Sequence, residues 1–184
     1  MKLILASNSP RRKELLQKAG FQFDIIPSTE DEVANKLLPP DKYTESLAYL
    51  KALSVYNKHG NVVLGADTVV YYNGEYLGKP KSKTDAELTL KKLSGKTHLV
   101  TTGYAIISKE KTVKGSVTTT VTFNNLSSEL ITEYLNSNLW QGKAGSYGIQ
   151  DGFNLVKNIN GDYDNVVGLP IKVITEILRE YYEK

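Results

Sequence analysis

The stretch Leu3-Ile4-Leu5-Ala6-Ser7-Asn8-Ser9-Pro10-Arg11-Arg12 decides how the fold begins. Its first four residues are apolar, and the amphipathic run Lys13-Glu14-Leu15-Leu16-Gln17-Lys18-Ala19 follows it and stops at Gly20. This order predicts a strand, a tight loop and a helix. Ser9 suits the N-cap of that helix, and Pro10 suits its first position.

A helix that begins here leaves backbone N–H groups unpaired at the positive end of its dipole. Two hydroxyls and two guanidiniums lie in the same place, those of Ser7, Ser9, Arg11 and Arg12. Such a group of donors binds phosphate. The same residues also fit a capped helix with two solvated arginines, and the stretch matches neither a P-loop nor a GxGxxG fingerprint. Both interpretations therefore stay open at this point.

The composition indicates a soluble globular protein that forms one domain, residues 1–184. Hydrophobic residues make up 40% of the chain and charged residues 23%, and the net charge of +3 is too small to imply nucleic acid. The lack of cysteine excludes disulfides and thiolate sites and fits a cytoplasmic protein. The apolar run at the N-terminus is too short for a signal peptide, and no stretch is long enough for a membrane span.

The two histidines, His59 and His98, lie far apart in the sequence and have no carboxylate neighbours. A zinc site or a Ser-His-Asp triad is therefore not expected. Any metal bound by this chain is expected to be a hard cation on oxygen ligands.

The remaining pattern predicts an α/β fold with a mixed sheet, flanking helices and two lobes around a central cleft. Residues 98–107 and 113–123 are expected to form an antiparallel hairpin, and Asn73-Gly74 a two-residue turn. Further strands are expected at residues 21–26, 61–64, 69–72, 75–77 and 155–159. Further helices are expected at residues 42–58, 84–93, 126–136 and 168–182. The second of these helices opens with the capping box Thr84-Asp85-Ala86-Glu87.

Asp67 is an acid between two apolar strand runs, a position that is costly unless the carboxylate has a partner or a function. The preceding Gly65-Ala66 leaves space beside it. Lys79 lies between a glycine and a proline, so it is either an ordinary basic turn residue or a side chain held in a fixed direction.

Lys51 lies near the edge of an apolar stripe that Leu47, Leu50 and Val55 are expected to form on their helix. A lysine there usually extends its ammonium group into water. The alternative is that this ammonium group points into a cleft.

Three loops stand out by composition. Residues 27–32 carry Glu30, Asp31 and Glu32, which fits a solvated acidic loop, and residues 162–165 form a second acidic loop. Residues 140–149 contain three glycines, and Gln150 follows directly. A glycine-rich loop of this length either closes over a ligand or turns tightly around a buried aromatic side chain.

The candidate residues together suggest a reaction. They are Ser7, Ser9, Arg11, Arg12, Glu32, Lys51, Asp67 and Lys79. Cations and backbone donors suit a polyphosphate, whereas carboxylates would be repelled by it unless a divalent cation lies between them. A bound Mg²⁺ can polarise the phosphorus and acidify a water, and a second carboxylate can deprotonate that water. The residues therefore point to hydrolysis of a phosphoanhydride.

The chain resembles the Maf family of nucleoside triphosphate pyrophosphatases, also called septum formation inhibitor Maf proteins, over essentially its whole length. The resemblance rests on several motifs in order. They are residues 3–12, Glu32 at the end of its loop, Leu50-Lys51-Ala52, Gly65-Ala66-Asp67-Thr68, Leu77-Gly78-Lys79-Pro80, Leu93-Ser94-Gly95, Ala144-Gly145-Ser146-Tyr147-Gly148-Ile149-Gln150 and Gly168-Leu169-Pro170.

The resemblance implies a reaction in which a nucleoside triphosphate and water give the monophosphate and pyrophosphate. Members of the family need a divalent cation, typically Mg²⁺ or Mn²⁺, and are often homodimers. Their fold is mixed α/β, like that of the inosine triphosphate pyrophosphatases.

The resemblance also implies roles for particular residues. Asp67 matches the general base, and Glu32 matches a carboxylate that positions metal or water, so that both are expected metal ligands. The phosphate-binding positions are matched by Ser7, Ser9, Arg11, Lys51 and Lys79. Among the three acids at 30–32, alignment to the motif favours Glu32, while the contact itself stays open.

The family divides by substrate, and Arg12, Thr68 and Gln150 match the subgroup that acts on dTTP and UTP. The subgroup that prefers 7-methyl-GTP has Gly-Ser-Asp-Gln at the central motif, which this chain lacks. The amide of Gln150 can both donate to and accept from the edge of a pyrimidine base. The implied function is removal of unwanted nucleotides, modified pyrimidine triphosphates among them. The alternative is a non-catalytic, nucleotide-binding regulator of septum formation.

Overall fold

The computed structural model describes residues 2–29 and 35–182. The strands are β1 Leu3–Leu5, β2 Phe23–Ile25, β3 Val62–Tyr72, β4 Glu75–Leu77, β5 Thr97–Ile107, β6 Thr112–Phe123 and β7 Val156–Asn160. The helices are α1 Pro10–Lys18, α2 Pro40–His59, α3 Lys83–Leu93, α4 Ser128–Asn136, α5 Tyr163–Val167 and α6 Ile171–Tyr182, with a 3-10 helix η1 at Ala144–Ser146.

The strands pair as a mixed sheet in the order β2-β1-β3-β5-β6-β7, with β4 paired to β3. Strand β1 runs parallel to both neighbours, so that Leu3 lies opposite Phe23 on one side and Val62 on the other. Strands β4 and β7 run antiparallel to β3 and β6 respectively. The predicted α/β class with a mixed sheet is therefore confirmed.

The chain divides into two compact units, each built from separated segments of the sequence. Unit 1 comprises Met1–Thr68, Thr102–Val117 and Gly168–Lys184, and unit 2 comprises Val69–Thr101 and Thr118–Val167. The long strands β3, β5 and β6 contribute residues to both units. The single domain and the central cleft expected from the sequence stay predictions.

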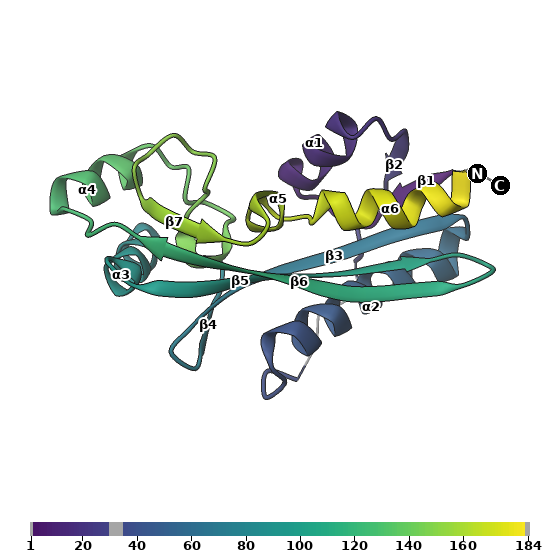
Figure 1. The fold of residues 1–184 in the computed structure, drawn as a ribbon, viewed down its shortest axis with the longest axis horizontal. Helices are drawn as coiled ribbons and strands as arrows, with labels where there is room; N and C mark the ends of the chain where they lie inside the picture. The colour runs from purple at the N-terminus through teal and green to yellow at the C-terminus, as the bar shows by residue number, and fades with distance from the viewer. Residues whose placement is uncertain (1, 30–34, 183–184) are drawn as a thin grey trace. The chain divides into compact units, whose positions relative to one another are not determined.

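In unit 1, helices cover both faces of the strands, with α1 and α6 on one face and α2 on the other (Figure 1). Leu5 and Leu64 are fully buried and pack in one cluster with Leu178 of α6. Their sequence neighbours Ile4 and Val63 belong to a second cluster with residues of α2. Because successive strand residues point to opposite faces and both faces are covered, residues 3–5 of β1 and 62–64 of β3 are all apolar.

Unit 2 has a core of its own. Leu90 of α3 and Tyr134 of α4 are fully buried and pack in one cluster with Val100, Val121 and Phe123 of the strands. Each unit therefore has buried apolar clusters of its own.

The glycine-rich loop turns around buried aromatic side chains. Trp140 and Tyr147 are both buried, and the ring of Tyr147 meets that of His98 edge-on at 5.5 Å between centroids. Gly145 has a φ of +69°, and a Cβ at this position would lie 2.8 Å from Val70. This is the tight turn around an aromatic core that was one of the two alternatives for the loop.

The start of α3 differs from the prediction. Ser82 is its N-cap, because Ser82 Oγ accepts a hydrogen bond from the Asp85 N–H at 3.1 Å. Ser82 also has the extended backbone conformation of an N-cap, with a φ of −151° and a ψ of 167°. The predicted capping box at Thr84 is therefore wrong, since Thr84 lies inside the helix.

Three smaller details also differ from the prediction. Leu50 is 41% exposed, whereas Leu47 and Val55 of the same expected stripe are buried. The second acidic loop contains helix α5, which begins at Tyr163. Strand β3 runs unbroken from Val62 to Tyr72, where two separate strands were expected.

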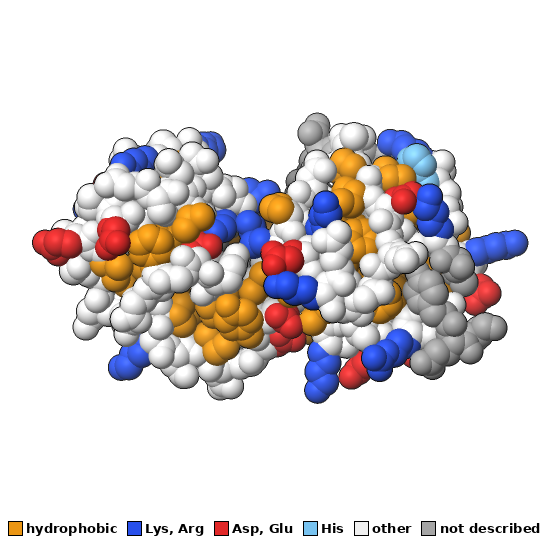
Figure 2. Space-filling model, turned by 90° about the horizontal axis from the view of Figure 1, so that it is seen from above, with side chains coloured by type: hydrophobic (Ala, Val, Ile, Leu, Met, Phe, Trp, Pro, Cys, Tyr) orange, Lys and Arg blue, Asp and Glu red, His pale blue; other side chains and the backbone are white. Residues whose placement is uncertain are grey.

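Charged side chains of both signs are interspersed on the face drawn in Figure 2, rather than gathered in one basic stripe. Ion pairs such as Lys2–Asp24 and Lys92–Glu75, both at 2.5 Å, are exposed to solvent. Within the described part of the chain, no helix combines the length and the apolar character needed to cross a membrane.

His98 makes the stability of unit 2 depend on pH. Its side chain is 1% exposed, and its Nε2 shares a hydrogen bond of 2.7 Å with the hydroxyl of Tyr147. Burial lowers the pKa of His98 from 6.5 to about 4. The unfolded chain takes up this proton near pH 6.5, so the stabilisation is complete above that pH and is lost as the pH falls towards 4. This loss is expected to be about 3 kcal/mol in the free energy of unfolding.

Urea unfolding of His98→Gln between pH 7 and pH 4 measures this contribution, because the glutamine cannot take up the proton. The variant is expected to lose stability less steeply than the unmodified protein over this range. His59→Gln is the matched control, since His59 is exposed at the end of α2. Equal pH slopes for His98→Gln and the unmodified protein would refute the role of His98.

Candidate functional site

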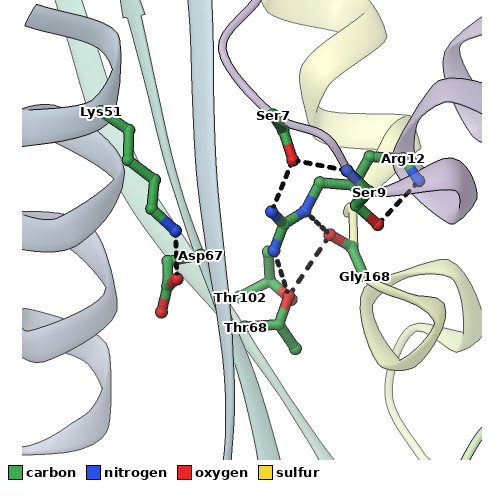
Figure 3. A network of polar contacts seen from close by, with 8 residues as sticks. All are labelled: Ser7, Ser9, Arg12, Lys51, Asp67, Thr68, Thr102 and Gly168. Carbon is green, nitrogen blue, oxygen red and sulfur yellow. Dashed lines mark hydrogen bonds and ion pairs between the residues drawn. The ribbon is translucent and has the colours of Figure 1, made fainter. Parts of the chain in front are cut away.

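Lys51 and Asp67 form a close ion pair in unit 1. Lys51 Nζ of α2 donates to Asp67 Oδ1 of β3 at 2.6 Å (Figure 3). The two side chains are only 11% and 14% exposed. The ammonium group of Lys51 thus points inward instead of extending into water, and the acid within the strand has a partner. Such a pair is costly to shield from water, because both charges lose most of their hydration.

Gly65 brings α2 close enough to β3 for this pair to form. A Cβ added at Gly65 would lie 2.3 Å from the carbonyl oxygen of Ala48 and 2.8 Å from the backbone nitrogen of Ala52, both in α2. Gly65 and Asp67 are two residues apart on one strand, so their side-chain positions share a face of the sheet. The close approach at Gly65 therefore places Lys51 opposite Asp67.

Arg12 is the centre of a second set of contacts in unit 1 (Figure 3). Its Nε donates to the carbonyl of Gly168 at 2.8 Å, and its Nη1 donates to Ser7 Oγ at 3.0 Å. Its Nη2 donates to Thr68 Oγ1 at 3.0 Å, and that oxygen shares a further hydrogen bond of 2.9 Å with Thr102 Oγ1. The guanidinium thereby joins the loop before α1, strand β3 and the turn before α6.

The loop between β1 and α1 is also held by its own hydroxyls. The Ser9 N–H donates to Ser7 Oγ at 3.2 Å, and Ser9 Oγ accepts from the Arg12 N–H as the N-cap of α1. The predicted strand, loop and helix, with Pro10 at the first helical positions, are therefore confirmed. The positive end of the α1 dipole lies at this loop, which is a favourable place for an anion.

The two arginines of the loop differ in their surroundings. Arg12 is 8% exposed and its guanidinium is engaged with protein groups, so the interpretation with two solvated arginines does not hold for Arg12. Arg11 is half-buried. Of the two, Arg11 is therefore the more exposed to solvent.

Asp67 and Thr68 are neighbours on β3 and point to opposite faces of the sheet (Figure 3). Asp67 faces α2 and its Lys51, whereas Thr68 faces Arg12 and the loop before α1. Strand β3 thus connects the ion pair to the Arg12 contacts through two adjacent residues.

The structure brings together only part of the predicted set. Ser7, Ser9, Arg11, Arg12, Lys51, Asp67 and Thr68 all belong to unit 1. Lys79 and Gln150 belong to unit 2, and both are exposed. Glu32 lies outside the described residues, as do Glu30 and Asp31.

Two further members of the site were given no role from the sequence: Thr102, and Gly168, which was quoted only within the motif Gly168-Leu169-Pro170. Thr102 lies in a strand rich in threonine, so nothing in its sequence position marks it as the partner of Thr68. Gly168 takes part through its backbone carbonyl, which no side-chain motif can reveal. Its φ of +137°, a conformation that favours glycine, explains why a glycine occupies this position.

The described residues of the site supply few oxygen ligands for a hard cation. Among the described residues, no group of three or more histidine, cysteine or acidic side chains is arranged to hold a metal. Asp67 supplies one carboxylate, and Mg²⁺ is commonly held by one or two carboxylates together with phosphate oxygens and waters. The residues present therefore fit a cation that arrives with a phosphorylated ligand.

Comparison with known proteins identifies the family of this chain. Residues 2–181 match the family model Maf, described as Maf-like protein. A dTTP/UTP pyrophosphatase of Pyrococcus abyssi is 49% identical over 179 residues, covering 96% of this chain and 95% of that protein. A dTTP/UTP pyrophosphatase of Bacillus mycoides is 50% identical over 182 residues, covering 98% and 95%. The chain belongs to the Maf family.

A solved structure also resembles the fold. The HAM1 protein from Coxiella burnetii superimposes with a TM-score of 0.56, covering 98% of this chain and 99% of that chain. The two sequences are only 14% identical, so this likeness concerns the fold alone.

Replacing Arg12 tests whether its contacts hold unit 1 together. Arg12→Lys keeps the positive charge but cannot reach three partners with one ammonium group. We expect a loss of about 3 kcal/mol in the free energy of unfolding, because a buried carbonyl and a buried hydroxyl lose their donors. Urea unfolding measures this loss. Arg11→Lys is the matched control and is expected to lose less than about 1 kcal/mol, and equal losses would contradict the account.

Replacing Gly65 tests the close approach of α2. Gly65→Ala is expected to destabilise the protein by at least about 2 kcal/mol, because its methyl group overlaps the helix backbone. Gly78→Ala is the control, since a Cβ at Gly78 meets nothing within 4 Å. Thermal unfolding of both variants measures the difference. Comparable melting temperatures would show that the approach of α2 does not depend on Gly65.

Proposed function

We propose that this member of the Maf family hydrolyses dTTP and UTP to the nucleoside monophosphate and pyrophosphate. The observation that carries the proposal is the shielded Lys51–Asp67 pair, joined through β3 to the loop that Arg12 holds. Support comes also from relatives at about half identity over nearly the whole chain that are named dTTP/UTP pyrophosphatases. The biological role proposed is removal of unwanted pyrimidine nucleotides, modified ones among them.

In the proposed reaction, Asp67 acts as the general base. Its carboxylate takes a proton from a water, the water oxygen forms a bond to phosphorus, and the phosphoanhydride bond breaks so that pyrophosphate leaves. Lys51 now pairs with Asp67 Oδ1 at 2.6 Å. When a triphosphate arrives, its negative oxygens compete for that ammonium group, which releases the carboxylate to the water.

The remaining cations are assigned to the phosphates. Arg11, next to the positive end of α1, and Lys79 are proposed to neutralise the negative charge of the triphosphate, together with the loop of Ser7 and Ser9. Arg12 and Thr68 are proposed to influence substrate choice by fixing the shape of this loop, since both side chains are engaged with each other. Gln150 is proposed to contact the base.

A divalent cation, Mg²⁺ or Mn²⁺, is part of the proposal. When bound, it would offset the charge of the phosphates and polarise the phosphorus. Asp67 would hold it from the described part of the chain, and Glu32 is proposed as a second ligand.

The proposal also includes a homodimer and a cytoplasmic location. The homodimer is proposed because members of the family are often homodimers. The location is supported by the complete lack of cysteine in the chain.

Turnover of the Asp67→Asn variant tests the proposed base. Asparagine keeps the shape of the side chain but cannot accept the proton. Pyrophosphate release from dTTP with Mg²⁺ is expected to fall at least about 100-fold while the fold is retained. Asp24→Asn is the matched control and is expected to keep normal turnover, because Asp24 lies in β2 and pairs with Lys2 at the surface. Near-normal turnover of Asp67→Asn would remove Asp67 from this role.

A panel of common and modified nucleoside triphosphates tests the substrate class. The unmodified protein is expected to release pyrophosphate fastest from dTTP, UTP and their modified forms. Inactivity on every triphosphate would overturn the enzyme proposal and leave the non-catalytic regulator of septum formation as the alternative.

A further inference from the structure

A buried ion pair in unit 2 has no part in the chemistry proposed above. Lys143 Nζ lies 2.5 Å from Oδ1 and 2.6 Å from Oδ2 of Asp151. The two side chains are only 9% and 5% exposed. Lys143 contacts both carboxylate oxygens of Asp151 inside the protein. Its ammonium group therefore pairs with Asp151 instead of facing a ligand.

A tyrosine completes this cluster. Tyr134 of α4 is fully buried, and its hydroxyl donates to Asp151 Oδ2 at 2.7 Å. The same hydroxyl accepts a hydrogen bond from the Gly148 N–H at 3.2 Å. Burial, and next the bond to Asp151, raise the pKa of Tyr134, so the hydroxyl remains a donor throughout the neutral range.

These contacts all converge on one tight turn, residues 148–151. The Asp151 N–H donates to the Gly148 carbonyl at 3.2 Å and closes the turn. Its first residue is held by Tyr134, and the side chain of its last residue is held by Lys143 and Tyr134. A Cβ at Gly148 would lie 2.7 Å from both carboxylate oxygens and from Lys143 Nζ, so the turn backbone lies directly against the ion pair.

Gln150 is the third residue of this turn, and it is exposed. The turn therefore fixes the backbone of Gln150 at both sides while its amide group faces solvent. An amide that reads the edge of a base must hold its donor and acceptor in one direction, and such precision depends on a fixed support.

We propose that the Lys143–Asp151 pair positions Gln150 for recognition of the pyrimidine base. The inference rests on the proposed function, because Gln150 is assigned to the base only there. Lys143 and Asp151 are positioning residues, since they act through the turn and need not touch the substrate.

Lys143→Met tests this inference, because methionine keeps the length of the side chain and removes the charge that holds Asp151. The KM for dTTP and UTP is expected to rise about 10-fold, while kcat stays within about twofold. The KM for dATP, whose purine base lies outside the substrate class proposed for Gln150, is expected to stay unchanged. The preference for pyrimidines over dATP in kcat/KM therefore falls about 10-fold, which a general loss of folded protein would not produce.

Three further single variants and one double variant complete the design. Asp151→Asn keeps the shape of the side chain and its contact to Tyr134, and it is expected to show the same selective rise in KM. This variant tests the inference independently if Lys143→Met fails to fold. Gln150→Ala is expected to match Lys143→Met, and the double variant is expected to be no worse than Gln150→Ala alone. Lys157→Met is the control, because Lys157 is an exposed lysine of β7 in the same unit.

The outcomes separate this inference from the proposed function. An unmodified protein that is inactive on every triphosphate contradicts the proposed function itself. An active, pyrimidine-selective protein whose Lys143→Met and Asp151→Asn variants keep the normal KM and selectivity overturns the inference alone. Additive effects of Lys143→Met and Gln150→Ala also overturn it, since they would show that the pair acts by another route.

Discussion

The guanidinium of Arg12 is the constraint on which the site in unit 1 depends. Three of its N–H groups are paired with Ser7, Thr68 and the carbonyl of Gly168, at distances of 2.8 to 3.0 Å. These partners lie in three segments that are far apart in the sequence. Because arginine presents its donors as a rigid planar fork, one buried side chain sets the distances between all three segments. The loop before α1 is thereby fixed to the strand that carries Asp67.

The same strand explains why the site can hold opposite charges. Asp67 and Thr68 point to opposite faces of β3, so the carboxylate meets Lys51 while the hydroxyl meets Arg12. Both pairs are shielded from water. Removing charged groups from water costs free energy, so a gain in stability alone does not explain these buried charges. Gly65 allows the first pair to form by letting α2 approach the strand. The packing of unit 1 thus holds a shielded carboxylate against a shielded ammonium group.

Much of the fold could be predicted from the sequence, because its signals are local. The cap at Ser9, the turn at Asn73-Gly74 and the apolar strand runs each depend on neighbouring residues. The start of α3 was misplaced because Ser82 and Thr84, two positions apart, both fit an N-cap, and only the backbone conformation selects Ser82. Contacts between segments that are distant in the sequence leave no such local signal. Contacts of this kind bury Arg12, give it an acceptor at Gly168 and form the cluster around Asp151. The residues themselves indicated most of the candidates, and the resemblance to a family added Thr68 and Gln150. Only the structure shows that the guanidinium of Arg12 is engaged with Thr68.

Product identification by ³¹P NMR during turnover of dTTP with Mg²⁺ tests the central claim most directly. The account predicts that dTMP and pyrophosphate appear in equal amounts, with no dTDP at any time. Formation of dTDP with orthophosphate, or a dTTP spectrum that does not change, would contradict it.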